Sequence, residues 1–150
     1  MYPESNLQKL LATMKPELQP GEYVFASVTV DDSKIARGAV VGRFRESEGI
    51  TLILERSAAI ASGIEFTFPP RMITPTIHSS LEAVGFLAVI TKRLAAAGIS
   101  VNAISAYYHD HLFVPLQKAN QAMHILHAIS EEAAVNLQNK SSMRGKQIRS

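Results

Sequence analysis

The stretch Ile73–Val114 reads ITPTIHSSLEAVGFLAVITKRLAAAGISVNAISAYYHDHLFV and holds most of the information about the fold. It starts in a strand-like run at 72–78 and continues through a long apolar segment that ends at Gly98. Two further strand-like runs follow, and a helix opens at Pro115, a position where proline is tolerated. The order strand, helix, strand, strand, helix is a split βαβ unit that lacks one strand.

The helix inside this stretch is predicted to begin at a capping box and to be apolar around most of its circumference. Ser79 and Glu82 have the S-x-x-E spacing of such a box, and the helix should run to Ala97. A helix that packs on one sheet needs a single apolar stripe, so the excess predicts a second packing partner, either another subdomain or another copy. The apolar positions are Leu81, Val84, Phe86, Leu87, Ala88, Val89, Ile90 and Leu94.

The strands and last helix of this half carry further signals. Pro75 cannot donate to a ladder, so its strand is expected to be at an edge there or bulged. The alternation of Ile99–Tyr108 slips at Ala103-Ile104, as a β-bulge would cause. The strand His111–Val114 follows the turn His109-Asp110. In the helix after Pro115, apolar residues at helical spacing predict the core face, namely Ala119, Ala122, Met123, Leu126 and Ile129.

The N-terminal half predicts a short helix and then several strands. Ser5 or Asn6 can cap a helix over Leu7, Leu10, Leu11 and Met14, which Pro16 and Pro20-Gly21 should end. Strands are predicted over 22–30, 38–45 and 50–55, with a hairpin turn at Gly49, a helix over 56–62 that closes at Gly63, and a short strand over 64–68.

The chain is long enough for one ordinary domain or two small ones that share a core. Pro69-Pro70 is the best candidate boundary, which divides the chain into subdomains 1–68 and 69–134. The missing strand of the second subdomain should come from the N-terminal half, with 22–30 as the candidate. Residues 135–150 are expected to form a basic, disordered tail.

Charge and composition exclude several classes of protein. The chain has no cysteine, which removes disulfides, thiolate metal sites and a cysteine nucleophile, and suits a cytoplasmic protein. Four of its 15 basic residues lie in the last twelve positions, and the remainder has 11 basic and 13 acidic residues. Nucleic-acid binding is therefore not expected of the folded part. No apolar run is long enough to span a membrane, and no export signal is expected.

These residues resemble the ACT domain, a small βαββαβ regulatory module, and more closely a bacterial family with two tandem ACT-like units of unsettled function. The resemblance implies an α+β, ferredoxin-like fold in which two ACT-like subdomains pack as one body. The matching segments are Gly49–Leu52, Arg71–Thr74, His78–Gly85, Ala97–Asn102 and Tyr107–Pro115.

The resemblance also implies a ligand site between the first strand–helix turn of one unit and a strand of its neighbour. A helix N-terminus there could hold a carboxylate, and the Asn102 amide could meet a polar group of the ligand. The implied ligand is an amino acid and the implied assembly a homodimer, without cofactor. The residues carried over are His78, Ser79, Ser80, Leu81, Glu82, Val84 and Gly85, with Val101, Asn102 and Ala103.

Simpler readings of these residues stay open. Ser79 and Glu82 serve equally well as a helix cap alone, Gly85 as a packing glycine, and Asn102 as a partner of the backbone. His109-x-His111 and His124-x-x-His127 supply four imidazoles for an alternative zinc site, but His124 and His127 should face solvent.

Catalysis has less support than binding. His78, Ser79, Ser80 and Asp110 could be arranged as a hydrolase site, yet neither a G-x-S-x-G elbow nor an H-E-x-x-H helix occurs in the sequence. The sequence therefore favours a non-catalytic regulatory or sensor protein that binds a small molecule. The alternatives are a structural or partner-binding module without ligand, and a histidine-based metal-binding protein.

Overall fold

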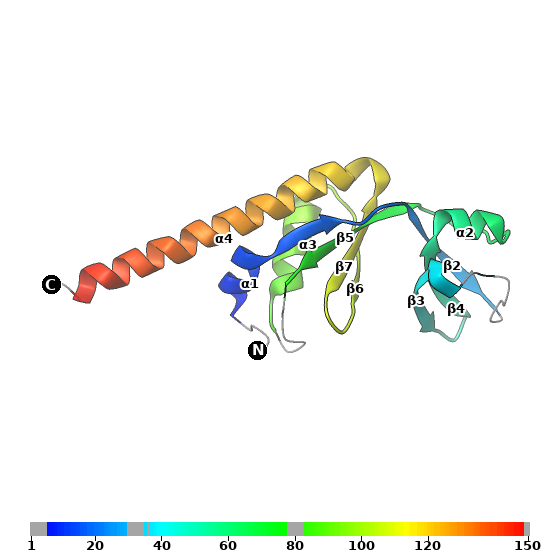
Figure 1. Ribbon diagram of the computed structural model, residues 1–150, viewed down its shortest axis with the longest axis horizontal. Coiled ribbons are helices and arrows are strands. Elements are labelled where there is room, and N and C mark those ends of the chain that lie inside the picture. The colour runs from blue at the N-terminus through cyan, green and yellow to red at the C-terminus, as the bar shows by residue number, and fades with distance from the viewer. Residues whose placement is uncertain (1–5, 30–34, 36, 78–82, 149–150) are drawn as a thin grey trace.

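The computed structural model describes residues 6–29, 35, 37–77 and 83–148, which form two antiparallel β-sheets and four α-helices (Figure 1). The elements in chain order are α1 Leu7–Thr13, β1 Lys15–Leu18, β2 Tyr23–Val28, η1 Arg37–Ala39, β3 Val40–Arg45, β4 Ile50–Glu55, α2 Arg56–Ala61, β5 Pro70–Thr76, α3 Phe86–Ala96, β6 Asn102–Ser105, β7 Asp110–Pro115, η2 Leu116–Lys118 and α4 Ala119–Ile148.

The larger sheet has the strand order β1-β5-β7-β6. Strands β5, β6 and β7 come from the opening stretch, and β1 pairs with β5 in antiparallel register, with Leu18 opposite Ile73. The expectation that the N-terminal half supplies the missing strand is confirmed. The candidate strand was wrong, because 22–30 contains β2 of the other sheet, and the strand that joins is Lys15–Leu18.

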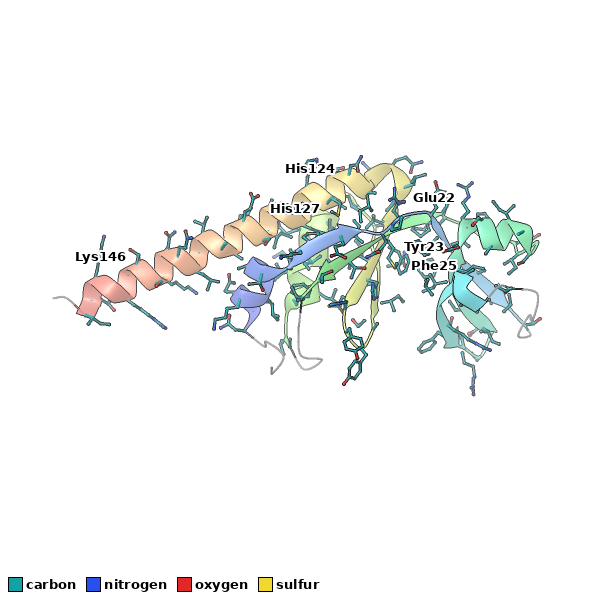
Figure 2. The ribbon with its side chains drawn as sticks, in the orientation of Figure 1. Glu22, Tyr23, Phe25, His124, His127 and Lys146 are labelled. Atoms are coloured by element: carbon teal, nitrogen blue, oxygen red, sulfur yellow. The ribbon has the colours of Figure 1, made fainter. Side chains whose placement is uncertain are left out.

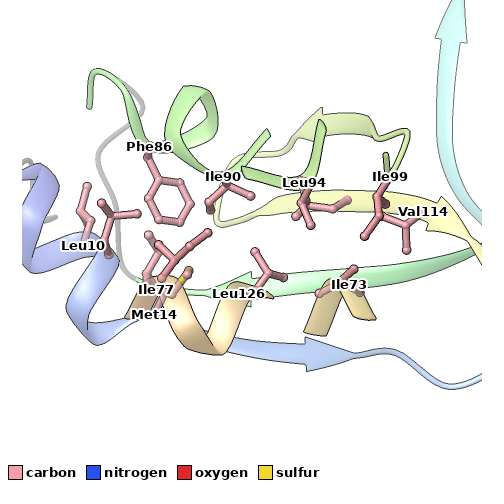
Figure 3. Packing of buried hydrophobic residues seen from close by; sticks show 14 of the residues in the cluster. Leu10, Met14, Ile73, Ile77, Phe86, Ile90, Leu94, Ile99, Val114 and Leu126 are labelled. Atoms are coloured by element: carbon pink, nitrogen blue, oxygen red, sulfur yellow. The ribbon is translucent and has the colours of Figure 1, made fainter. Parts of the chain in front are cut away.

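Helices α1, α3 and α4 cover one face of this sheet and enclose the main core (Figure 3). Leu10 of α1, Ile90 of α3 and Leu126 of α4 are all almost completely buried there. The additional apolar face of α3 is satisfied within the chain, since Leu87 and Val89 also pack against this cluster. α1 is capped as predicted, because Asn6 Oδ1 accepts a hydrogen bond from the Lys9 N–H at 3.1 Å.

The smaller sheet has the order β2-β4-β3 and its own core of Val24, Ala26, Leu52 and Leu54 with Ala59 of α2. The predicted short strand over 64–68 is reduced to an isolated bridge between Thr67 and Phe25. This bridge places Thr67 on the free side of β2. The second unit is assembled from two parts of the sequence, because residues 7–18 pack with it while residues 23–67 build the first unit.

A small aromatic cluster joins the two sheets. Phe113 of β7 makes edge-on contacts with Phe25 at 5.1 Å and Tyr23 at 6.1 Å between ring centroids. Ile53 and Met72 complete the cluster. Met72 and Phe113 project from the face of the large sheet that the helices do not cover. The small sheet therefore packs against that face at one end.

Three local expectations need correction or refinement. α3 begins at Phe86, because Ala83, Val84 and Gly85 are not helical; the predicted box of Ser79 and Glu82 lies outside the described residues. β6 keeps a regular register with β7 over Asn102–Ser105, so the expected bulge is absent from that strand; the alternation slips because all four residues are exposed. Pro75 lies beyond the β5–β7 register and opposite Pro16 of β1.

The expectation of a disordered tail is wrong for residues 135–148, which continue α4 beyond the sheet (Figure 1). The composition of this segment suggested disorder because it is polar. Extending an existing helix, however, avoids the costly nucleation step, and the Leu, Gln, Lys, Met and Arg residues of this segment are good helix formers. The last buried residue of α4 is Ala133.

Candidate functional site

A pocket of about 160 Å³ lies between the N-terminal turn of α3 and the β6–β7 hairpin. One wall is the start of the helix and the other is the turn that joins the two strands. The lining residues are Ala83, Gly85, Phe86, Leu87 and Ala88 on the helix side, and Ser105, Ala106, Tyr107, Tyr108, His109 and Asp110 on the hairpin side.

The helix wall presents backbone donors for which the described residues supply no acceptor. The first intrahelical bond of α3 runs from the Val89 N–H to the Gly85 carbonyl at 3.0 Å. The N–H groups of Phe86, Leu87 and Ala88 consequently have no acceptor within the helix, and no side chain of the described residues caps them. The positive end of the helix dipole adds to these donors. This wall can bind a carboxylate or another small anion.

Gly85 allows the chain to enter the helix at this wall. Its φ of +93° is a left-handed conformation that glycine adopts with little strain. A Cβ at this position would also come within 3.3 Å of Leu7 Cδ2. The pocket wall is therefore supported from behind by α1.

The hairpin wall is held by hydrogen bonds and carries one carboxylate. Ser105 Oγ donates to Asp110 Oδ1 at 2.6 Å, and the Ala106 N–H donates to the His109 carbonyl at 3.0 Å. Tyr107 and Tyr108 contact each other edge to face at 5.0 Å and are largely exposed at the tip. With Oδ1 of Asp110 engaged, Oδ2 is the oxygen of that carboxylate that could accept a bond from a cation.

The two histidines of the hairpin are both tied to β5 and its continuation. His109 Nδ1 lies 3.0 Å from the Ile77 carbonyl, which can only accept, so this nitrogen carries the proton and Nε2 is the nitrogen left for other partners. His111 Nδ1 lies 2.8 Å from Thr74 Oγ1. Burial lowers the pKa of His111, nearby His109 lowers it further, and Asp110 acts in the opposite direction.

The predicted site residues are only partly brought together. Gly85 lines the pocket, whereas Val84 projects into solvent with 84% of its surface exposed. Val101, Asn102 and Ala103 lie before or on the edge strand β6 and do not line the pocket. His78, Ser79, Ser80, Leu81 and Glu82 lie outside the described residues.

The sequence reasoning missed the hairpin wall as part of a site. Tyr107 and Tyr108 were named only in a segment of family resemblance, and His109 was also considered as a metal ligand. Asp110 was also considered in a turn and in the hydrolase alternative, but not as a ligand-binding residue. A signal was present in the Ser105 to Asp110 spacing, since a serine and a carboxylate that flank a short turn can bond across it. The pairing with the start of α3 depends on the tertiary fold.

The histidines do not converge with other metal-binding side chains. Within the described ranges, no three His, Cys, Asp or Glu side chains are grouped closely enough to hold a metal ion. His124 and His127 are exposed on α4, as predicted, and Figure 2 shows them on that helix, away from the hairpin. Among the helices described, none is both long enough and apolar enough to cross a membrane.

Comparisons with known proteins agree with this architecture. Two family models described as ACT domain match residues 2–71 and 67–128. A Vibrio cholerae crystal structure, described as a protein of unknown function and possible transport protein, is 43% identical with a TM-score of 0.74, over 83% of this chain and 95% of that one. No curated protein matches the chain.

Two more distant structures share the fold. An Agrobacterium tumefaciens protein is 16% identical with a TM-score of 0.67, over 78% of this chain and 89% of that one. The α and β subunits of an aspartokinase are 12% identical with a TM-score of 0.55, over 76% of this chain and 95% of that one. With its α+β sheets and its two family matches, the chain belongs to the ACT-domain family and carries two ACT domains in tandem.

Proposed function

We propose that this protein binds a small amino acid in the pocket between α3 and the β6–β7 hairpin and acts as a regulatory sensor without catalysis. ACT domains are commonly ligand-binding regulatory modules and are typically non-catalytic. That general role agrees with the proposal, and the local chemistry of the pocket supplies the ligand class.

The observation that carries the proposal is the pairing of opposite charge preferences across one pocket. The N–H groups of Phe86, Leu87 and Ala88 suit an α-carboxylate, and Asp110 on the facing hairpin suits an α-ammonium group. A free amino acid carries both groups on one carbon. A simple anion would satisfy only the helix wall and would face the carboxylate of Asp110 without compensation.

The volume of the pocket selects for a small ligand. At about 160 Å³ the pocket is small for a ligand site. Sites for drug-sized ligands are larger, at about 300–1,000 Å³. An amino acid with a short side chain suits a pocket of about 160 Å³, and the exposed rings of Tyr107 and Tyr108 lie at its rim.

Thermal unfolding in the presence of each of the twenty amino acids tests the proposal. A ligand at 100 times its Kd stabilises the native state by about 2.7 kcal/mol, which raises the Tm of a chain of this size by roughly 5–10 °C. We expect one or a few small amino acids to produce such a shift. The absence of any shift at millimolar concentration would refute amino-acid binding.

Two variants of the hairpin locate the site. Asp110→Asn removes the carboxylate, and we expect it to abolish the shift while the protein still folds. Ser105→Ala is the matched control, because it removes the 2.6 Å hydrogen bond to Asp110 and leaves the charge. Equal loss of binding in both variants would mean that the hairpin bond, and not the charge, is what the ligand requires.

A second candidate function, partner binding without a small ligand, is favoured by the free edge of the large sheet. All four residues of β6 are exposed, and its backbone pairs with β7 on one side only among the described strands. Such an edge can accept a strand from another protein or from a second copy. A proline substitution at Ala103 that abolishes self-association, with no amino acid giving a thermal shift, would favour this function.

A further inference from the structure

The outer side of α4 carries a charged stripe that is complementary to itself and that runs from the core-packed part of the helix to its far end. Residues spaced by three and four positions share one side of a helix. On α4 such a series runs along the side opposite the core, with an acid near its start and a base near its end. It consists of Ala128, Glu131, Val135, Asn139, Ser142 and Lys146, called here the α4 stripe.

Within the part of the chain that the structure describes, the charged residues of the stripe have no ion-pair partner. Glu131, Val135, Asn139, Ser142 and Lys146 are all exposed. The neighbouring Glu132 is engaged, because Arg93 of α3 donates two hydrogen bonds to its carboxylate at 2.7 and 3.0 Å. Glu131 takes part in no ion pair within the described residues. Figure 2 shows Lys146 at the far end of the helix, well away from the rest of the protein.

We propose that the α4 stripe binds the same stripe of a second copy in an antiparallel helix pair. In this arrangement Glu131 of each copy faces Lys146 of the other, which forms two equivalent ion pairs. A parallel pair would instead place like charges opposite each other. Because Glu131 and Lys146 are 15 residues apart, roughly 22 Å of helix separates the two ion pairs. The pairing has twofold symmetry, as an isologous dimer requires.

The centre of the stripe suits close approach of two helices. Asn139 lies next to the twofold axis of this pairing, and its amide both donates and accepts, so the two copies of Asn139 can bond to each other. The uncharged Val135 and Ser142 lie on either side of it. At the start of the stripe, a shallow open depression of about 510 Å³ is lined by Ala128, Glu131, Glu132, Val135 and Asn136, and it leaves room for side chains of the second helix.

A single engineered cysteine tests the geometry, because the natural chain has none. We expect Asn139→Cys to form a disulfide-linked dimer under mild oxidation, since the two copies of this residue meet at the axis. Lys140→Cys is the matched control, because this neighbouring exposed residue lies off the stripe, and we expect it to stay monomeric on a non-reducing gel. Failure of Asn139→Cys to cross-link, or equal cross-linking of both variants, would overturn the proposal.

Charge reversal tests the ion pairs by sedimentation equilibrium. Glu131→Lys or Lys146→Glu should each weaken the dimer roughly tenfold, because attraction becomes repulsion at two symmetric contacts. The double variant restores opposite charges and should return the dissociation constant to near that of the wild type. Lys140→Glu makes the same charge change off the stripe and should have little effect. A monomeric wild type, or a double variant as weak as the single ones, would overturn the proposal. Neither result depends on whether an amino acid binds.

Discussion

Thr74 Oγ1 and His111 Nδ1 lie 2.8 Å apart on the face of the large sheet that the helices do not cover. Gln19 Nε2 donates to the same hydroxyl at 3.3 Å, so the hydroxyl hydrogen is available for His111. His111 Nδ1 is then an acceptor, and the neutral imidazole is the form that this network stabilises. This agrees with a pKa of His111 below its ordinary value of 6.5.

The network predicts that the protein loses stability as the pH falls. Because the folded state lowers the pKa of His111, it binds fewer protons than the unfolded chain. The contribution to the free energy of unfolding is therefore complete above pH 6.5 and is lost as the pH falls through the lower pKa of the folded state. We expect His111→Gln to reduce the slope of the unfolding free energy against pH in this window, measured by urea denaturation.

Thr74→Val is the companion variant for the same network. It removes the hydroxyl that donates to His111 Nδ1 and keeps the side-chain shape. Burial, the largest cause of the lowered pKa of His111, stays in place, so any rise in this pKa reports the hydrogen bond alone. Titration of the His111 ring by NMR in both proteins measures this directly. A wild-type pKa at or above 6.5 would contradict the proposed direction of the hydrogen bond.

Replacement of Phe113 by alanine should strongly destabilise the protein. Its side chain is only 2% exposed and contacts Tyr23 and Phe25 of the other unit. Truncation of a buried phenylalanine typically costs about 3–5 kcal/mol. Phe44→Ala is the control, because Phe44 is 71% exposed and the change should stay within about 0.5 kcal/mol. Similar losses in both variants, measured by denaturant unfolding, would show that Phe113 does not join the units.

Gly85→Ala should impair both the fold and the ligand site, and Gly98→Ala separates the two effects. Both glycines have positive φ, +93° and +74°, so alanine should cost each about 1–2 kcal/mol. Only at Gly85 does the added Cβ meet another side chain, Leu7, and only Gly85 lines the pocket. We expect ligand-induced stabilisation to be lost in Gly85→Ala and retained in Gly98→Ala. Retention of this stabilisation in Gly85→Ala would place the ligand elsewhere.

Removal of residues 139–150 should leave the stability of the core unchanged. The last buried residue of α4 is Ala133, so this truncation removes no core side chain. At low protein concentration the Tm should stay within about 2 °C of the full chain. A truncation after Met123 is the contrasting case, since it removes the buried Leu126 and Ile129 and should prevent folding. A large loss of Tm in the shorter truncation would mean that the end of α4 packs on the body.

Local sequence patterns predicted the elements that depend on neighbouring residues. The cap at Asn6, the alternation of β2, the stop of α3 before Gly98 and the core face of α4 each follow from spacing along a few residues. The start of α3 was misplaced because S-x-x-E is a capping signal wherever it occurs, whereas the described chain enters the helix through the left-handed Gly85. The sequence therefore placed its candidate ligand site near the start of α3 and did not include the hairpin that forms the other wall of the pocket.

The sequence by itself determined the family, through the segments that resemble the ACT domain. It also determined the α+β class and most helices and strands, because capping and hydrophobic period are local properties of the chain. The tertiary structure alone decided that Lys15–Leu18 is a strand and which sheet it joins. The segment Lys15–Leu18 is four residues long, contains Pro16 and is followed by Pro20-Gly21, so it carries almost no periodic signal. Its conformation is fixed by pairing with β5, which lies far along the chain. The pocket between α3 and the hairpin was likewise decided by the approach of distant segments. The extension of α4 past the core depends instead on how far a helix continues once the core has established it.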